Sequence, residues 1–161
     1  SEEGKIIAFI PDSRFEFDKY RNITKVTKLI SDFYLNKKKP SFEELIDQRL
    51  HWHGITTKDL WIKYNIHKKM PNSLADDCLN IEYNMVLNNQ IDLGNDRKEI
   101  ESIFEQHSRN NYIDAHVNCF TPESFKNIME ILFKLKYTTL KIEKLNPTIE
   151  GWHEFSVILH K

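Results

Sequence analysis

The stretch that decides the fold reads KIIAFIPD and occupies residues 5–12. Residues Lys5 to Ile10 form a short, largely apolar run, and Pro11 and Asp12 end it. Continuous runs of this kind are typical of strands that are buried on both faces. We therefore predict that a sheet begins here, with a buried strand over Lys5–Ile10.

Polar side chains follow this strand directly, at Asp12, Arg14 and Asp18. Ligands of open α/β sheets bind outside the carboxyl ends of the strands, so we expect a site in this loop. We expect Arg14 and Asp18 to bind substrate, since Arg14 can clamp a phosphate or carboxylate with two hydrogen bonds. Asp12 is a candidate catalytic residue, able to bind a hydroxyl or to act as a base. A solvated turn with a surface ion pair is the alternative.

The clearest helix lies in the C-terminal third of the chain. Thr121 can cap it, and Pro122 suits its first position. One apolar face follows at helical spacing, formed by Phe125, Ile128, Met129, Leu132 and Phe133. Thr138–Leu145 and Glu154–Leu159 then alternate apolar and polar residues, which predicts two strands. The loop between them contains proline and glycine, so we expect these strands to pair antiparallel.

A helical insertion is predicted between these parts, over about residues 20–110. Thr24–Leu35 carries apolar residues at helical spacing. Ser41 and Glu44 form a capping box that starts a further helix, and Asp96 with the glutamate three positions later resembles it. Two more stretches carry weaker helical patterns: Thr57–Ile62 and Leu74–Val86.

Composition narrows the class of protein. The 161 residues, 40% of them hydrophobic, suit a single domain over residues 1–161. The formal charge of -1 gives no global field to recruit nucleic acid, so none is expected as a partner. No apolar run approaches the roughly 20 residues of a membrane span. Cys78 and Cys119 are too few for a disulfide framework, which fits a reducing, cytoplasmic location, although one disulfide stays open.

Three segments resemble one known family, the Rossmann-like S-adenosylmethionine methyltransferases of class I. EGKIIAFIPD at residues 3–12 resembles the glycine turn that feeds their fifth strand. In one bacterial branch the residues after that strand read much like Pro-Asp-Lys-Arg-Tyr-x-Phe-Asp. Residues 11–18 of this chain resemble them, with Ser13 in place of the lysine. YIDAHVNCFTPESF at residues 112–125 resembles that branch's entry into its last helix, and Glu154 with Phe155 its final strand.

The resemblance implies an α/β fold that corresponds to the C-terminal half of the methyltransferase sheet. Its elements would be a parallel strand, a crossover helix and two terminal strands, one of them antiparallel, with the helical insertion added. The cofactor-binding glycine-rich loop and acidic residue of the family belong to the first two strands, which this chain does not contain. The four glycines are too widely spaced for a phosphate-cradling loop. The cofactor is therefore unknown, and S-adenosylmethionine is expected only together with an upstream half.

The branch is associated with glycan gene clusters, and this implies an enzyme that modifies a sugar or a surface polysaccharide. A carbohydrate or nucleotide sugar would then be the acceptor. A degenerate, non-methylating domain is the alternative: it would bind an acceptor or a partner, or carry another transferase or ligase activity on a carbohydrate. A third possibility is structural, because an unpaired sheet edge must be covered, either by a covalently linked upstream domain or by a second copy.

Further candidate site residues lie near the start of the C-terminal helix and in the last loop. His116 with Asp114 can form a general base in which a carboxylate orients the imidazole, although both can also lie on a solvated face. Trp152 is either a substrate-stacking platform or a lid over the sheet edge. No metal is expected; His51 and His53 offer a weak metal pattern, with a surface loop as the alternative.

Overall fold

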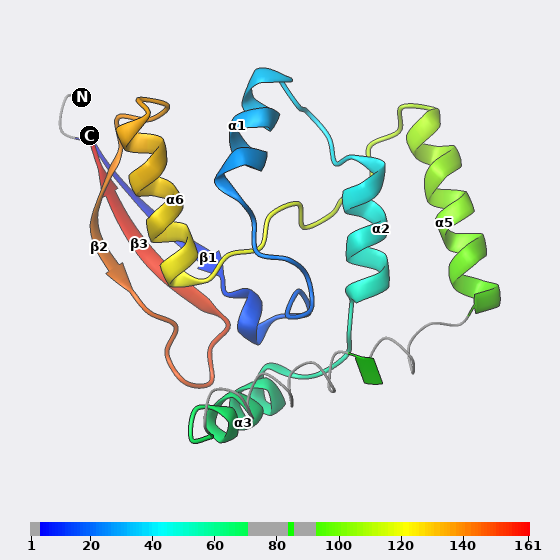
Figure 1. The fold of residues 1–161 in the computed structure, drawn as a ribbon, viewed down its shortest axis with the longest axis horizontal. Helices are drawn as coiled ribbons and strands as arrows, with labels where there is room; N and C mark the ends of the chain where they lie inside the picture. The colour runs from blue at the N-terminus through cyan, green and yellow to red at the C-terminus, as the bar shows by residue number, and fades with distance from the viewer. Residues whose placement is uncertain (1–3, 71–83, 86–92) are drawn as a thin grey trace.

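The structure is a computed structural model, and it describes residues 4–70, 84–85 and 93–161. Within these ranges the chain has a mixed α/β fold with five helices, one 3-10 turn and a small antiparallel sheet of three strands (Figure 1). The elements in chain order are β1 (Lys5–Pro11), η1 (Ser13–Phe15), α1 (Val26–Tyr34), α2 (Phe42–His51), α3 (Thr57–His67), α5 (Leu93–Ser108), α6 (Pro122–Lys134), β2 (Lys141–Asn146) and β3 (Glu154–His160).

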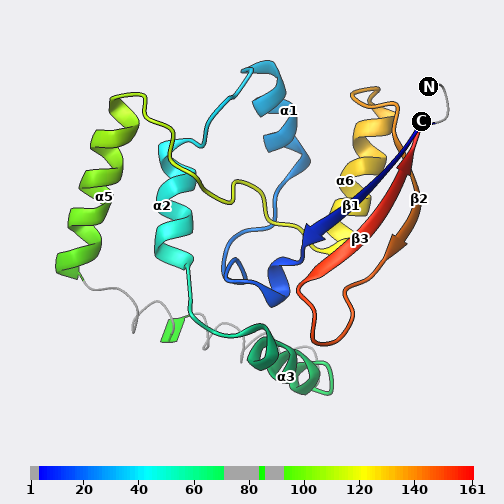
Figure 2. The same ribbon diagram turned by 180° about the vertical axis from the view of Figure 1, so that it is seen from behind.

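The sheet joins the two ends of the chain. Its order is β1-β3-β2, and β3 pairs antiparallel with both neighbours, from Lys5 against His160 to Pro11 against Glu154 on the β1 side (Figure 2). The expected first strand and the expected antiparallel terminal pair are thus confirmed. β1 and β2 point the same way but are not neighbours, so the sheet contains no parallel pair. A Rossmann-like sheet is not confirmed by these three strands.

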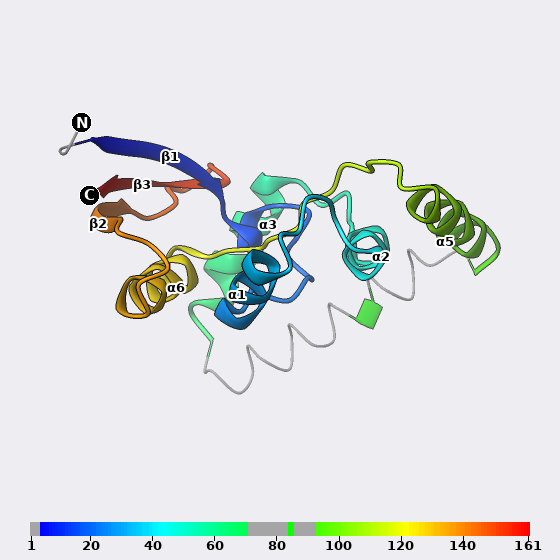
Figure 3. The ribbon, with the colours of Figure 1, turned by 90° about the horizontal axis from the view of Figure 1, so that it is seen from above.

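One part of the core lies between β3 and α6, which covers one face of the sheet (Figure 3), and a second part includes Phe15, Leu45 and Leu60. Phe155, Val157 and Leu159 alternate along β3 and are buried. The Phe155 ring lies 5.8 Å from the ring of Phe125 on α6, in an edge-to-face contact. The period-2 pattern of the last strand therefore predicted its buried face correctly.

β1 is far more exposed than the sequence predicted. Ile7 is 67% exposed and Phe9 is 69% exposed. Their partners across the ladder are Ile158 and Ser156, which lie on the face of β3 that α6 does not cover. The expectation of a strand buried on both faces is wrong for the described chain, because β1 is an edge strand and its outer face has no covering element there.

Two helices begin where their capping signals predicted. The Thr121 hydroxyl accepts from the Ser124 amide, and the Ser124 hydroxyl accepts from the Thr121 amide, so a capping box opens α6. Ser41 and Glu44 make the same reciprocal bonds at the start of α2. These bonds satisfy amides that a first helical turn leaves free.

Other helix boundaries differ from the prediction. α5 already begins at Leu93, so Asp96 lies inside its first turn and is not its cap. Instead, the Asp96 carboxylate accepts a hydrogen bond from Arg49. α3 extends well beyond Thr57–Ile62, to His67. The weaker pattern over Leu74–Val86 lies almost wholly outside the described residues.

Among the helices of the described ranges, none is long and apolar enough to cross a membrane.

Candidate functional site

Three loops meet at the carboxyl end of β1, where the sequence places its first candidate site. The amide of Asp12 donates to the carbonyl of His153, in the β2–β3 loop, over 2.7 Å. The amide of Ser13 donates to the carbonyl of Phe120, just before α6, over 2.9 Å, and Asp12 and Phe120 form a parallel bridge. These contacts fix the backbone on which the candidate residues stand.

Asp12 and Arg14 are occupied with one another. The Asp12 side chain is fully buried, and it accepts from Arg14 Nε at 2.9 Å and from Arg14 Nη2 at 2.6 Å. The Thr148 hydroxyl donates to Asp12 Oδ2 over 2.6 Å. The hydrogen bond to Asp12 raises the pKa of Arg14, whose guanidinium also lies 5.4 Å from the centre of the Tyr64 ring. A carboxylate so enclosed is poorly placed to act as a base, and we assign this pair a structural role.

His116 is held on several sides by groups far away in the sequence. Its Nδ1 lies 2.9 Å from Oδ2 of Asp18, which is only 3% exposed. Arg21 donates to Asp18 Oδ1 over 2.9 Å and also to the His116 carbonyl. Gln48 Oε1 accepts from the His116 amide at 2.7 Å, and the Phe17 ring lies 4.7 Å from the imidazole. The backbone and the ring of His116 are therefore both fixed.

This arrangement leaves one ring nitrogen available for chemistry. A carboxylate only accepts hydrogen bonds, so the contact with Asp18 assigns the proton to His116 Nδ1 and leaves Nε2 as the basic nitrogen. The His116 side chain is 44% exposed. In the ranges that the structure covers, no side chain or backbone group bonds Nε2. The geometry is that of a general base oriented by a buried carboxylate.

The sequence pairs His116 with Asp114, but the carboxylate that orients His116 in the structure is Asp18. Asp114 is exposed, and its Oδ1 accepts from the Tyr112 hydroxyl at 3.4 Å. The predicted pairing is wrong because Asp114 and His116 stand on an extended segment, while the turn after η1 brings Asp18 up to the imidazole.

Trp152, the other expected binding residue, lies in the β2–β3 loop with its side chain 62% exposed. Its carbonyl accepts from Trp61 Nε1 at 2.7 Å. Trp61 in turn stacks on the buried Phe15, with the ring centres 3.8 Å apart. The backbone of Trp152 thus helps to hold α3, and its indole has a large exposed area.

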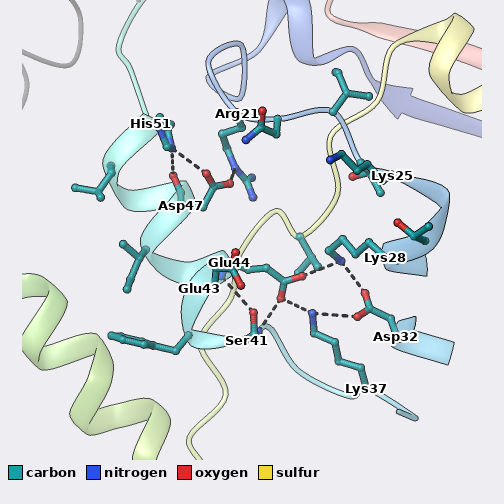
Figure 4. A pocket seen from close by; sticks show the side chains of 18 of the residues that line it. Arg21, Lys25, Lys28, Asp32, Lys37, Ser41, Glu43, Glu44, Asp47 and His51 are labelled. Carbon is teal, nitrogen blue, oxygen red and sulfur yellow. Dashed lines mark hydrogen bonds and ion pairs between the residues drawn. The ribbon is translucent and has the colours of Figure 1, made fainter. Parts of the chain in front are cut away.

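A chain of ion pairs continues from Arg21 to His51. Arg21 Nε donates to Asp47 Oδ2 over 2.7 Å, and His51 Nδ1 lies 2.9 Å from Asp47 Oδ1 (Figure 4). The hydrogen bond with Asp47 raises the pKa of His51, although burial opposes it. The same bond lowers the pKa of Asp47. His51 is therefore engaged by a carboxylate on its own helix.

A cavity of about 1040 Å³ lies beside these residues, between α1 and α2. Glu44 lies in it and meets Lys28 at 2.8 Å and Lys37 at 2.5 Å (Figure 4). Burial alone would raise the pKa of Glu44, but the two lysines and the Ser41 amide lower it to about 2. The charged groups of this cavity thus largely neutralise one another.

His53 lies in the interior and does not join His51. It is 1% exposed, its Nδ1 accepts from the Ile55 amide at 3.2 Å, and its ring packs edge-on against Tyr20. Burial lowers the pKa of His53 to about 4, so the imidazole is neutral near neutral pH. Across the described residues, the structure brings together no group of three possible metal ligands.

The cysteines take no part in this site. Cys119 is buried, and burial raises the pKa of its thiol to about 12, so the reactive thiolate is scarce at neutral pH. Cys78 lies outside the described residues.

The residues that the structure describes do not form a binding site for S-adenosylmethionine. Such a site needs glycines where backbone and ligand approach closely. Gly151 has a φ of +86° but no atom within 4 Å of the place where a Cβ would stand, and Gly54 approaches only Trp52, at 4.0 Å. Gly151 lies in the β2–β3 turn and Gly54 at an exposed position of the connection between α2 and α3, and neither shows the close approach that a cofactor cradle needs.

Comparison of the chain with protein-family models, with curated proteins and with solved structures finds no match.

Proposed function

We propose that this chain carries the acceptor side of a group-transfer reaction, with His116 as its general base. In this proposal it is the C-terminal part of a methyltransferase-like domain of a bacterial enzyme that modifies a sugar or a surface polysaccharide. One observation carries the proposal: buried Asp18 orients the imidazole of His116 and leaves Nε2 accessible.

The chemistry follows from that pair. Nε2 of neutral His116 accepts the proton of an acceptor hydroxyl as the oxygen becomes a nucleophile, and the proton then resides on the imidazole. Asp18 stabilises the resulting imidazolium, because its carboxylate lies 2.9 Å from Nδ1. Arg21 holds Asp18 and the His116 carbonyl and so keeps the base in position. We limit the proposed role to the acceptor, since the residues of this chain do not fit the cofactor.

The order of the elements supports the methyltransferase part of the proposal. β1 and β2 point the same way, α6 connects to β2 across one face, and β3 inserts antiparallel between them. The resemblance of residues 3–18 and 112–125 implies this same succession of strands and helix. Fold-level likeness does not by itself carry function, so the chemistry of His116 must be tested directly.

The test is a transfer assay on the natural polypeptide that contains this chain, with S-adenosylmethionine and a panel of sugar acceptors. General bases contribute about 10²–10⁴-fold, so we expect His116→Gln to lower kcat by roughly that factor. Asp18→Asn should lower kcat less and alter its pH profile. His153→Gln is the matched control, because His153 is similarly exposed (46%) but lies in the β2–β3 loop. A wild-type kcat in His116→Gln would overturn the proposal.

A second candidate is a non-methylating module that binds an acceptor or a partner, or that works as a ligase on a carbohydrate. Two observations favour it. Asp12 and Arg14 bond each other and are not free for catalysis, and the exposed apolar face of β1 offers a surface for a partner. Calorimetry of the natural polypeptide that contains this chain, with S-adenosylmethionine, nucleotides and nucleotide sugars, separates the candidates. Tight binding of S-adenosylmethionine would exclude the module, and tight binding of a nucleotide would favour the ligase.

A further inference from the structure

A second cavity, of about 450 Å³, lies on the other side of α2, beside the segment that leads to His116. We call it the Trp52 cavity. Residues of α2 and α5 line it, together with residues 113–115 of the segment that leads to His116. Its size is in the range of sites that hold small organic ligands.

The polar groups of the Trp52 cavity suit a ligand with many hydroxyls. Gln48, Glu99 and Asp114 bring an amide and two carboxylates, groups that bond hydroxyl donors and acceptors. Trp52 adds a broad apolar ring that is 51% exposed, and Leu45 adds aliphatic surface. The C–H face of a pyranose can pack on such an indole while its hydroxyls meet the polar groups. This combination matches a sugar ring better than a purely apolar or a purely ionic ligand.

The charge of the cavity narrows the kind of sugar. Arg49 is its basic residue, and the guanidinium already pairs with Glu99 and, at 2.5 Å, with Asp96. Among the described residues, the contact of the Asp114 carboxylate is with the neutral Tyr112 hydroxyl. The lining therefore presents surplus negative charge, which disfavours an anionic sugar and favours a neutral or amino sugar.

Gln48 connects this cavity to the proposed chemistry. Its side chain lines the cavity, and its Oε1 accepts from the His116 amide at 2.7 Å. Asp114 stands two residues before His116 on the same segment. The larger cavity between α1 and α2 is a poorer candidate, because two of its lysines, Lys28 and Lys37, are already paired with Glu44.

We propose that the Trp52 cavity is the acceptor subsite and binds a neutral or amino sugar, with Trp52 beneath the sugar ring. This rests on the proposed function insofar as the bound sugar is the acceptor that His116 deprotonates. Sugar binding itself does not require the transfer reaction and is measured separately.

The test uses the full chain with fluorotryptophan in place of its three tryptophans. Each ¹⁹F resonance is assigned with a Trp→Phe variant, and the chain is titrated with the methyl glycosides of glucose, galactose, N-acetylglucosamine, glucosamine and glucuronic acid. We expect the Trp52 resonance to shift saturably with a neutral or amino sugar and the Trp152 resonance to stay unchanged. Trp52→Ala should weaken binding at least tenfold, whereas Trp152→Ala, also an exposed tryptophan, should not.

Two further variants separate the possible failures. Asp114→Asn should weaken glucosamine binding severalfold more than glucose binding, which a merely structural Asp114 would not do. His116→Gln should retain sugar binding. Absence of a saturable shift of the Trp52 resonance, or strongest binding of the glucuronide, would overturn the proposed sugar subsite. Neither result would contradict the proposal that His116 is a general base. Normal sugar binding with normal transfer in His116→Gln would overturn the general base instead.

Discussion

At the scale of single residues, the site depends on which polar groups the fold brings together. His116, Asp18 and Arg14 were all recognisable in the sequence as reactive side chains. Their partners were not, because Asp18 and His116 are 98 positions apart and Gln48 is 68 positions from His116. No local pattern reports contacts of that separation. The sequence alone therefore singled out His116 as a candidate base but paired it with a carboxylate, Asp114, that the structure does not bring to the imidazole.

Buried His53 should make the protein less stable in mild acid. Its pKa is about 4 in the folded chain against an ordinary 6.5, so the unfolded chain takes up the proton first as the pH falls. The stability that His53 contributes is complete above 6.5 and decreases as the pH falls toward 4. We expect the free energy of unfolding to fall by about 1–2 kcal/mol between neutral pH and about pH 5.

Urea unfolding at both pH values, in wild type and in His53→Gln, measures this effect. The variant should lose most of the difference, while the exposed control His153→Gln keeps it. His51 acts with the opposite sign, because its pKa is raised and its contribution fades as the pH rises. Equal pH dependence in wild type and His53→Gln would contradict the role given to His53.

At the scale of elements, local capping signals correctly predicted where α2 and α6 begin. Tertiary contacts shifted the first residues of α1 and α5 from their predicted positions. The caps at Ser41 and Thr121 form because each hydroxyl meets an amide only three residues away. Asp96 carries a similar signal, but Arg49 on the neighbouring helix α2 engages its carboxylate. Thr24 likewise lies before the first residue of α1, and its hydroxyl accepts a hydrogen bond from the Cys119 amide.

Loss of the α6 cap should destabilise the whole molecule, since α6 covers the buried face of β3. Thr121→Ala removes the acceptor for the Ser124 amide, and we expect a loss of about 0.5–2 kcal/mol in the free energy of unfolding. Thr139→Ala, at an exposed threonine outside the regular elements, is the matched control. Denaturant titration measures both variants, and equal stability of the two would show that the cap contributes nothing.

At the scale of the whole molecule, α6 covers one face of the sheet, and no element of the described ranges covers the other face. The pattern of apolar residues predicted all three strands, but it could not predict the exposure of β1, because a continuous apolar run does not show which elements pack against it. Long-range pairing also made β3 the central strand, although it is the last element in the sequence. The local sequence thus predicted where the strands lie in the chain, but it did not predict their order in the sheet or their burial.

The open side of β1 should promote self-association, because unpaired edges and apolar faces template contacts between chains. We expect the wild-type chain to associate with rising concentration in sedimentation velocity, and Phe9→Lys to shift the distribution toward monomer. Tyr112→Lys is the matched control, since Tyr112 is also exposed (67%) but lies outside the sheet. Both variants should keep their stability within about 0.5 kcal/mol. A wild-type chain that stays monomeric throughout would refute this expectation.

The central position of β3 also has a consequence for synthesis on the ribosome. β1 and β2 cannot bond to each other, because β3 separates them, and β3 is translated after both. No ladder of this sheet can form until the residues of β3 have left the exit tunnel. At about 5–20 residues per second, the apolar β1 segment is without its partner for roughly 7–30 seconds. A stop codon upstream of β3 would accordingly abolish every ladder of this sheet, because both ladders include β3.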